Sequence, residues 1–322
     1  MTPKVSILIP VFNRRQFIAE CIQSALDQTF TDFEVVIVDN ASDDGTWEIC
    51  QRFATQYARV RVFRNETNIG PVRNWLRCIE EAKGQYGKLL FSDDLMMPEF
   101  LAETLPYLED PTVAFVSTAA LIGEALGNGV ACYALPGGRE RLSTKEYFEN
   151  LASRRYPVPL SPGAAIFRMA DLRANLLLHI PVAHPHDFTK NGAGPDVLLF
   201  ALTALRYQSV VMLQKPLVFF RRHADSFTRA NTGNAVTEGY RLALAWFFRK
   251  YLSKQHWASW LARIWLSEIW RRRAIKYPGM YATRYEGNSG LRDVSLIVLM
   301  SVRILIKRWL DAVIKIGLPQ SS

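Results

Sequence analysis

Continuous apolar runs alternate with helically spaced apolar positions along the first ninety residues of the chain. Residues 5–10 (VSILIP) and 34–38 (EVVIV) have the length and β-branched content of buried strands. Between them, residues 17–26 place apolar side chains at helical spacing. A strand, a helix and a strand in this order predict a βαβ unit, whose two strands run parallel in a covered sheet.

The same alternation continues to residue 108 and then becomes less regular. Further strands are expected at 59–63, 87–91, 113–117, 130–134, 163–167 and 208–218. Further helices are expected at 46–57, through Trp75 and Ile79, and at 99–108, 144–151 and 197–205. This order predicts an α/β fold with a Rossmann-like, mostly parallel sheet flanked by helices, which binds ligands beyond the carboxyl ends of its strands.

Carboxylates follow two of the predicted strands where each strand ends. Asp39 comes directly after the strand at 34–38, and Asp93 with Asp94 follows the strand at 87–91. Two carboxylates at a strand end can hold Mg²⁺ or Mn²⁺, and the ion can in turn hold a diphosphate. The alternative is that the pair only caps the next helix, which Pro98 would begin.

The loop after the first strand lacks a glycine-rich phosphate cradle. Residues 10–15 read PVFNRR, which fits neither of the usual glycine-rich nucleotide-binding patterns. A nucleotide on this sheet would therefore be held by carboxylates and a metal ion.

Positive charge and tryptophan are concentrated in the last quarter of the chain. Residues 1–237 carry 24 Lys and Arg against 25 Asp and Glu, whereas residues 238–322 carry 15 against 5. Six of the eight tryptophans lie in this second part. The chain thus divides into a near-neutral body and a basic, aromatic tail, which we predict to be separate regions at 1–234 and 235–322.

The tail has two helix-compatible stretches, at 238–276 and 289–318. The uncharged run from Val294 stops at Arg303, well short of the roughly 20 apolar residues of a membrane span. Basic, Trp-rich amphipathic helices suit the surface of an anionic membrane leaflet. The alternative is a helical extension that packs on the body or on another subunit. No nucleic-acid recognition motif accompanies the charge, so no nucleic-acid partner is expected.

Cysteine usage and the N-terminus both favour a cytoplasmic protein. The four cysteines are scattered without a metal-ligand or CxxC spacing, which favours reduced thiols. The first residues run straight into a strand pattern and lack the features of a signal peptide. With the basic tail, this predicts a protein bound peripherally to the inner face of the cell membrane.

Five segments together resemble the family 2 glycosyltransferases of the GT-A fold, of the type that builds bacterial polysaccharide and lipopolysaccharide. They are VSILIPVFN from Val5, EVVIVDNASDDGT from Glu34, the Asn68-x-Gly70 pair, FSDDLMMP from Phe91 and RRHADSFT from Arg221. The resemblance implies a GT-A domain with an amphipathic helical extension.

The resemblance also implies a role for several residues. Asp39 would contact the nucleobase and Asp93 the ribose, while Asp94 would ligate Mn²⁺ or Mg²⁺ on the donor diphosphate. Asp196 stands where the family has its general base. The other donor-binding residues would be Pro10, Phe12, Asn13, Asn68, Gly70, Arg222 and His223.

Two departures from the family pattern concern the metal and the base. Phe91 stands where many members carry a further acid, and Pro195 precedes Asp196 where Glu is usual. Asp187 is therefore a rival to Asp196, and capping of the helix that begins near residue 197 is the structural alternative for Asp196.

The implied reaction moves a sugar from a UDP-, dTDP- or GDP-sugar to a hydroxyl of a glycan or lipid-linked saccharide. A metal ion would stabilise the leaving diphosphate, and one carboxylate would take the acceptor's proton. A single displacement predicts inversion at the anomeric carbon. The alternatives are a nucleotidyltransferase and a catalytically silent scaffold that binds nucleotide sugars.

Overall fold

The computed structural model describes residues 2–182, 186–224, 234–270 and 291–317. They form two compact units. The sheet unit comprises Met1–Phe148, Arg155–Ile180 and Asp187–Tyr240, and the helical unit comprises Glu149–Arg154, Pro181–His186 and Arg241–Ser322. The division that the sequence predicts at residues 234 and 235 stays a prediction.

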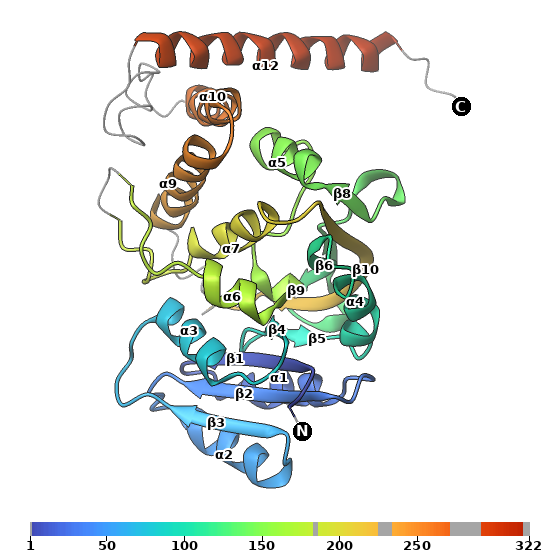
Figure 1. The fold of residues 1–322 in the computed structure, drawn as a ribbon, viewed down its shortest axis with the longest axis vertical. Coiled ribbons are helices and arrows are strands. Elements are labelled where there is room, and N and C mark those ends of the chain that lie inside the picture. Colours follow the sequence, from blue (N-terminus) through green and yellow to red (C-terminus); the bar gives the residue numbers. More distant parts are fainter. Residues whose placement is uncertain (1, 183–185, 225–233, 271–290, 318–322) are drawn as a thin grey trace. The chain divides into compact units, whose positions relative to one another are not determined.

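The first half of the sheet unit is a parallel α/β sheet (Figure 1). Its elements are β1 (Val5–Val11), α1 (Ile18–Leu26), β2 (Phe33–Asp39), α2 (Thr46–Gln56), β3 (Val60–Arg64), α3 (Pro71–Glu81) and β4 (Tyr86–Leu89). β1 lies between β2 and β4, β3 lies beyond β2, and all three pairings are parallel. The βαβ unit predicted from the apolar pattern is confirmed.

The second half of the unit extends this sheet with mixed pairings. Its strands are β5 (Leu95–Met96), β6 (Val113–Gly123), β7 (Val130–Cys132), β8 (Arg141–Ser143), β9 (Ala165–Arg168) and β10 (Ser209–Arg221). β9 pairs antiparallel with both β4 and β6, and β10 runs parallel to β6. The strand order is β3-β2-β1-β4-β9-β6-β10-β5, with β7 beside β6 and β8 beside β10.

Helices α4 (Phe100–Leu108), α5 (Thr144–Ser153), α6 (Met169–Asn175) and α7 (Pro195–Ala204) alternate with these strands. α5 continues into the helical unit at Glu149. The sequence pattern did not predict β5, α6 or the second half of β6. β5 and α6 are too short to show a period, and β6 is almost continuously apolar, so its end leaves no mark in the sequence.

The core explains why β1 and β2 are apolar throughout. Every residue of both strands is buried, because helices cover both faces of the sheet. Alternate β1 side chains pack in one cluster with the apolar stripe of α1, while α3 contacts β1 and β2 as well. This packing fixes the register in which the carboxyl ends of β1, β2 and β4 meet at one edge.

The helical unit contains most of α9 (Asn234–Tyr251), with α10 (Lys254–Trp270) and α12 (Leu291–Gly317). The helix-compatible stretch predicted at 238–276 is therefore broken after Tyr251. Ser253 directly precedes α10, and its Oγ accepts the His256 N–H at 3.4 Å as an N-cap does. Residues 225–228 of the predicted basic motif lie outside the described residues. None of the described helices is both long and apolar enough to cross a membrane.

Candidate functional site

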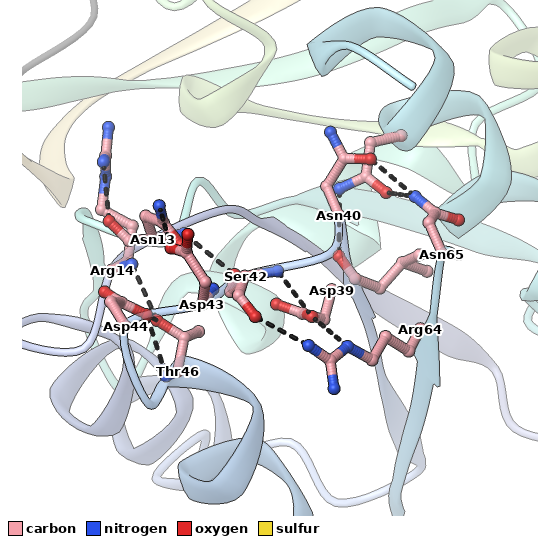
Figure 2. Close-up of polar contacts among 12 residues, drawn as sticks. Asn13, Arg14, Asp39, Asn40, Ser42, Asp43, Asp44, Thr46, Arg64 and Asn65 are labelled. Carbon is pink, nitrogen blue, oxygen red and sulfur yellow. Dashed lines mark hydrogen bonds and ion pairs between the residues drawn. The ribbon is translucent and has the colours of Figure 1, made fainter. Parts of the chain in front are cut away.

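The loops after β1 and β2 are tied together side by side (Figure 2). The Asn13 backbone N–H donates to Ser42 Oγ at 2.9 Å, and the Asn13 side chain makes two hydrogen bonds with Asp43, at 2.9 and 3.1 Å. Asn13 has a φ of +49°, a left-handed conformation that Asn adopts more readily than most residues. Asn13 therefore shapes the loop at the sheet edge.

Two further carboxylate and hydroxyl contacts hold the chain beyond Asn13. The Arg14 N–H donates to Thr46 Oγ1 at 2.8 Å, and the Arg15 N–H donates to the Asp44 carboxylate at 3.0 Å. Asp44 also accepts from the Thr46 N–H and hydroxyl. Asp43 and Asp44 are thus committed to the loop and are poor candidates for binding a ligand.

Asp39 is fully buried at the end of β2. Its Oδ2 accepts the Ser42 N–H at 3.1 Å and pairs with Arg64 Nε at 3.3 Å. Its Oδ1 is buried and has no hydrogen-bond partner among the described residues. Because buried polar atoms are almost always paired, this oxygen is suited to accept a hydrogen bond from a ligand.

A network of asparagines fixes the loop between β3 and α3. Asn40 Nδ2 donates to Asn68 Oδ1 at 2.8 Å, and Asn40 Oδ1 accepts from Asn65 Nδ2 and from the Ile69 N–H. Asn68 Oδ1 also accepts the Gly70 N–H at 2.9 Å. The predicted pair Asn68 and Gly70 is therefore anchored to the residue that follows Asp39.

The acid pair lies in the turn between β4 and β5. Asp93 Oδ2 is 3.0 Å from His223 Nε2 and 3.6 Å from Arg14 Nε. Asp94 Oδ1 accepts the Arg221 backbone N–H at 3.0 Å, and the Asp93 carbonyl accepts from Arg221 Nε at 3.1 Å. The antiparallel pairing of β5 with β10 brings these residues together, although about 130 positions separate them.

The helix-cap alternative for the acid pair is wrong. α4 begins at Phe100 with Glu99 at its N-cap, and no side chain caps it. Pro98 lies in the turn before the helix instead of in its first turn. Asp93 and Asp94 are therefore held by β10 and the loop after β1, which leaves them at the ligand-binding edge.

Burial raises the pKa of Asp94 well above its usual range, and the charge of Asp93 adds to the effect. Lys88 lies beneath the pair in β4, fully buried, with Nζ hydrogen-bonded to the carbonyls of Leu89 and Gly163. Burial lowers the pKa of Lys88 to about 7, against the opposing attraction of Asp94. A buried carboxylate beside another carboxylate is a place where added positive charge is stabilising.

The donor set fits a divalent cation that is shared with a phosphate ligand. The described residues contain no cluster of three His, Cys, Asp or Glu side chains that could hold a metal ion by themselves. Mg²⁺ in phosphate sites commonly uses one or two carboxylates, with water and phosphate oxygens as the other ligands. Asp94 accepts a single hydrogen bond from the described residues, at Oδ1, so Oδ2 can serve as a ligand.

His223 is built into this site, whereas Arg222 is exposed. The His223 ring packs against Phe17, with centroids 4.5 Å apart, and its Nδ1 is buried without a partner among the described residues. Arg221, which the sequence did not single out as a site residue, contacts both acids through its backbone and side chain. The role of Arg222 in binding the donor stays a prediction.

Asp196 lies in the first turn of α7, directly after Pro195. Its Oδ1 accepts the N–H groups of Gly194 and Val197 at 2.9 and 2.7 Å, and its Oδ2 accepts the Tyr240 hydroxyl at 2.5 Å. Burial raises the pKa of Asp196 to about 7, although these hydrogen bonds act in the opposite direction. The N-cap of α7 is Gly194, so Asp196 is not the capping residue.

Asp187, the rival base, has a different environment. It is exposed, and its Oδ1 accepts both the N–H and the hydroxyl of Thr189, at 3.0 and 2.6 Å. The Thr189 hydroxyl bond is the largest cause that lowers the pKa of Asp187. A carboxylate near neutral pKa is the better proton acceptor, which favours Asp196.

The two remaining predicted residues flank the end of β1. Pro10 is buried beside Val38 of β2, and Phe12 is 39% exposed just beyond the strand. Arg14, Asn40, Arg64 and Tyr240 contact site residues but were missed as site residues. A polar residue at the end of β3 was a usable signal for Arg64, whereas nothing in the sequence pointed to Tyr240.

The chain belongs to the family described as "Glycosyl transferase family 2", because the sequence model of that family matches residues 6–172. It is 35% identical over 105 residues to the glycosyltransferase GlyG of Streptococcus pneumoniae, and this match covers 33% of this chain and 35% of GlyG. It is 36% identical over 118 residues to a chondroitin synthase of Escherichia coli, and this match covers 36% of this chain and 17% of that protein. The matches span less than half the length of these relatives.

Solved structures confirm the predicted GT-A fold. TarS of Staphylococcus aureus, residues 1–349 in complex with UDP-GlcNAc, superposes with a TM-score of 0.57 at 16% identity and covers 94% of this chain and 92% of that one. The same region of TarS without that ligand gives 0.55 at 18% identity. At such identity, the likeness shows the fold.

Proposed function

We propose that this protein is an inverting glycosyltransferase that moves a sugar from a nucleoside-diphosphate donor to a hydroxyl of a saccharide acceptor. The observation that carries the proposal is the acid pair at the carboxyl edge of the sheet. Asp93 contacts His223 and Arg14 there, and Asp94 keeps one oxygen available. Family membership and the buried Asp39 at the same edge support the same reading.

Asp39 is the proposed nucleobase contact. Its Oδ1, which has no partner among the described residues, can accept a hydrogen bond, and the ring N–H of uracil, thymine or guanine can donate one. Arg64 and the Ser42 N–H hold the other oxygen, so the carboxylate is already oriented. A UDP-, dTDP- or GDP-sugar is the proposed donor.

Asp94 is the proposed ligand of Mn²⁺ or Mg²⁺, and Asp93 the proposed ribose contact. The ion, when bound, would act as a Lewis acid on the donor diphosphate. Arg14, 3.6 Å from Asp93, adds positive charge where the leaving group develops negative charge, and His223 holds the same carboxylate from the other side.

Asp196 is the proposed general base. Its pKa of about 7 leaves it partly ionised at neutral pH, so it can take the proton of the acceptor hydroxyl as that oxygen attacks the anomeric carbon. The bond from the sugar to the diphosphate breaks in the same step. One displacement inverts the anomeric configuration.

Turnover with a panel of UDP-, dTDP- and GDP-sugars and saccharide acceptors tests this function. We expect release of nucleoside diphosphate, an inverted linkage by NMR, and loss of turnover in Asp196→Asn but not in the matched control Asp187→Asn. Release of pyrophosphate would indicate a nucleotidyltransferase instead. Donor binding without turnover for every acceptor would indicate a scaffold.

The helical unit supports a peripheral position on the inner face of the membrane, where a lipid-linked acceptor would lie. One stripe of α12 packs in the unit's interior, where α12 contacts α10, through Ile297, Met300, Ser301 and Ile304. A second apolar stripe is 41% to 53% exposed and consists of Val298, Leu299, Val302, Leu305 and Ile306. The exposed Arg303 and Lys307 border this second stripe.

An apolar stripe bordered by basic side chains matches the surface of an anionic bilayer. We expect the protein to sediment with vesicles that contain phosphatidylglycerol and much less with phosphatidylcholine alone. Replacing Leu299 and Val302 together by Glu should abolish binding, whereas Val130→Glu, at an exposed apolar position of β7, should not. Binding that survives the double replacement contradicts the proposal. If the wild type does not bind vesicles but forms a dimer that the double replacement converts to a monomer, the stripe contacts a second copy of the chain instead.

A further inference from the structure

Tyr240 makes a short hydrogen bond to the proposed general base. Its hydroxyl lies 2.5 Å from Asp196 Oδ2, although the two residues are 44 positions apart. Distances of about 2.5 to 2.7 Å are typical of a hydroxyl that donates to a carboxylate, and such bonds are stronger than neutral ones. The first turns of α9 therefore bring one polar group directly to the carboxyl group of α7.

We propose that Tyr240 is a positioning residue for the general base, orienting Asp196 Oδ2 and keeping the carboxylate in its proton-accepting form. This inference rests on the proposed function of Asp196. It adds a residue from α9, outside the segment that matches the family description.

The hydrogen bonds of Asp196 divide its two oxygens between different tasks. Oδ1 accepts two backbone N–H groups, from Gly194 and Val197, and is thereby fixed to the start of α7. Oδ2 accepts from Tyr240, the one side-chain donor to Asp196 in the described part of the chain. A carboxylate oxygen can accept two hydrogen bonds, so Oδ2 retains a lone pair for the acceptor's proton. Tyr240 then determines where that lone pair points.

Among the described residues, two tyrosines, Tyr240 and Tyr133, are the titratable groups with an electrostatic link to Asp196. Burial, with the charge of Asp196 next, raises the pKa of Tyr240 well above its usual range, so Tyr240 remains a donor at any physiological pH. Burial also raises the pKa of Tyr133, to about 12, and Asp196 contributes to that shift. The Tyr240 hydrogen bond stabilises the ionised form of Asp196, against its burial.

Tyr133 also connects this group to the acid pair. Its ring meets Phe220 edge to face, with centroids 6.5 Å apart, and Phe220 directly precedes Arg221, which donates to Asp94. Tyr133, which lies close enough to Asp196 to feel its charge, therefore lies between the proposed base and the strand that holds the acid pair.

The test replaces Tyr240 by Phe, which removes the hydroxyl and keeps the ring. Tyr207→Phe is the matched control, because the Tyr207 hydroxyl donates to another buried aspartate, Asp171, at 2.7 Å. The Asp196 titration is followed by carbon NMR of protein labelled at the aspartate carboxyls, with Asp196→Asn to assign the signal. Release of nucleoside diphosphate is measured across the same pH range for each protein.

We expect the Asp196 midpoint to rise by about one pH unit in Tyr240→Phe, since a hydrogen bond to a charged group is lost. The acid limb of turnover should move with it, and turnover at pH 7 should fall about fivefold, because the ionised fraction of Asp196 falls from about one half to about one tenth. Tyr207→Phe should change neither. An unchanged midpoint and limb in Tyr240→Phe would overturn the role of Tyr240. Full turnover in Asp196→Asn would instead show that Asp196 is not the base, whatever its titration.

Discussion

The buried Asp196 should make the protein less stable at alkaline pH than its neutral variant. Its folded-state pKa is raised from the usual 3.8 to about 7, mainly by burial. The folded protein therefore binds a proton more tightly than the unfolded chain does. Between these two pKa values, unfolding releases that proton, so the free energy of unfolding falls as the pH rises and levels off above about 7.

The magnitude follows from the size of the shift. Asp196 is 7% exposed, so solvent screening reduces the effect little. Each pH unit between the two pKa values corresponds to about 1.4 kcal/mol, so ionisation costs about 4 kcal/mol in total at high pH. Between pH 5.5 and pH 8.5, the free energy of unfolding should therefore fall by about 2 kcal/mol through the ionisation of Asp196.

Urea unfolding of the wild type and Asp196→Asn at pH 5.5, 7 and 8.5 measures this quantity. The other titrating groups are common to both proteins, so they cancel in the difference. We expect the variant to gain about 2 kcal/mol on the wild type between the first and last pH, while losing turnover. Parallel stability curves would refute the reasoning, because they would mean that Asp196 titrates alike in both states.

Two further predictions concern a glycine and a histidine. Gly192→Ala should destabilise the protein by about 2 kcal/mol more than the matched Gly137→Ala, as measured by thermal unfolding. Both glycines have a φ near +70°, but a Cβ at Gly192 would meet the Trp75 ring at 2.3 Å, whereas a Cβ at Gly137 would meet nothing within 4 Å. Equal losses of stability in the two variants would contradict this packing. His223→Ala should lower the turnover number by about 10- to 100-fold, because Asp93 loses its partner at 3.0 Å. The circular dichroism spectrum should stay unchanged. A variant that turns over as fast as the wild type would show that His223 has no role in the site.

The parallel half of the sheet could be predicted because its signals are local. β1 and β2 are buried on both faces and read as continuous apolar runs, and α1 between them has a clear helical period. The βαβ rule then places Asp39 and the acid pair at one edge without further information. The predicted site thus follows from topology and strand ends.

The contacts that complete the site could not be predicted in this way. Arg221 reaches the acid pair because β5, a strand of two residues, pairs with β10. Tyr240 reaches Asp196 from a helix that carries no motif. Both depend on pairings between distant segments, which neither periodicity nor spacing encodes.

The most direct test of the central claim is thermal unfolding with UDP-, dTDP- and GDP-sugars, each with and without Mn²⁺. A ligand that binds the folded state raises its apparent stability. We predict that the nucleotide sugars of one nucleobase stabilise the protein and that this effect depends on Mn²⁺. The effect should be absent in Asp94→Asn. It should be retained in the control Glu99→Gln, because Glu99 is exposed and lies only five residues after Asp94. No stabilisation by any nucleotide sugar, or an equal shift in Asp94→Asn, would contradict a metal-dependent donor site at this edge of the sheet.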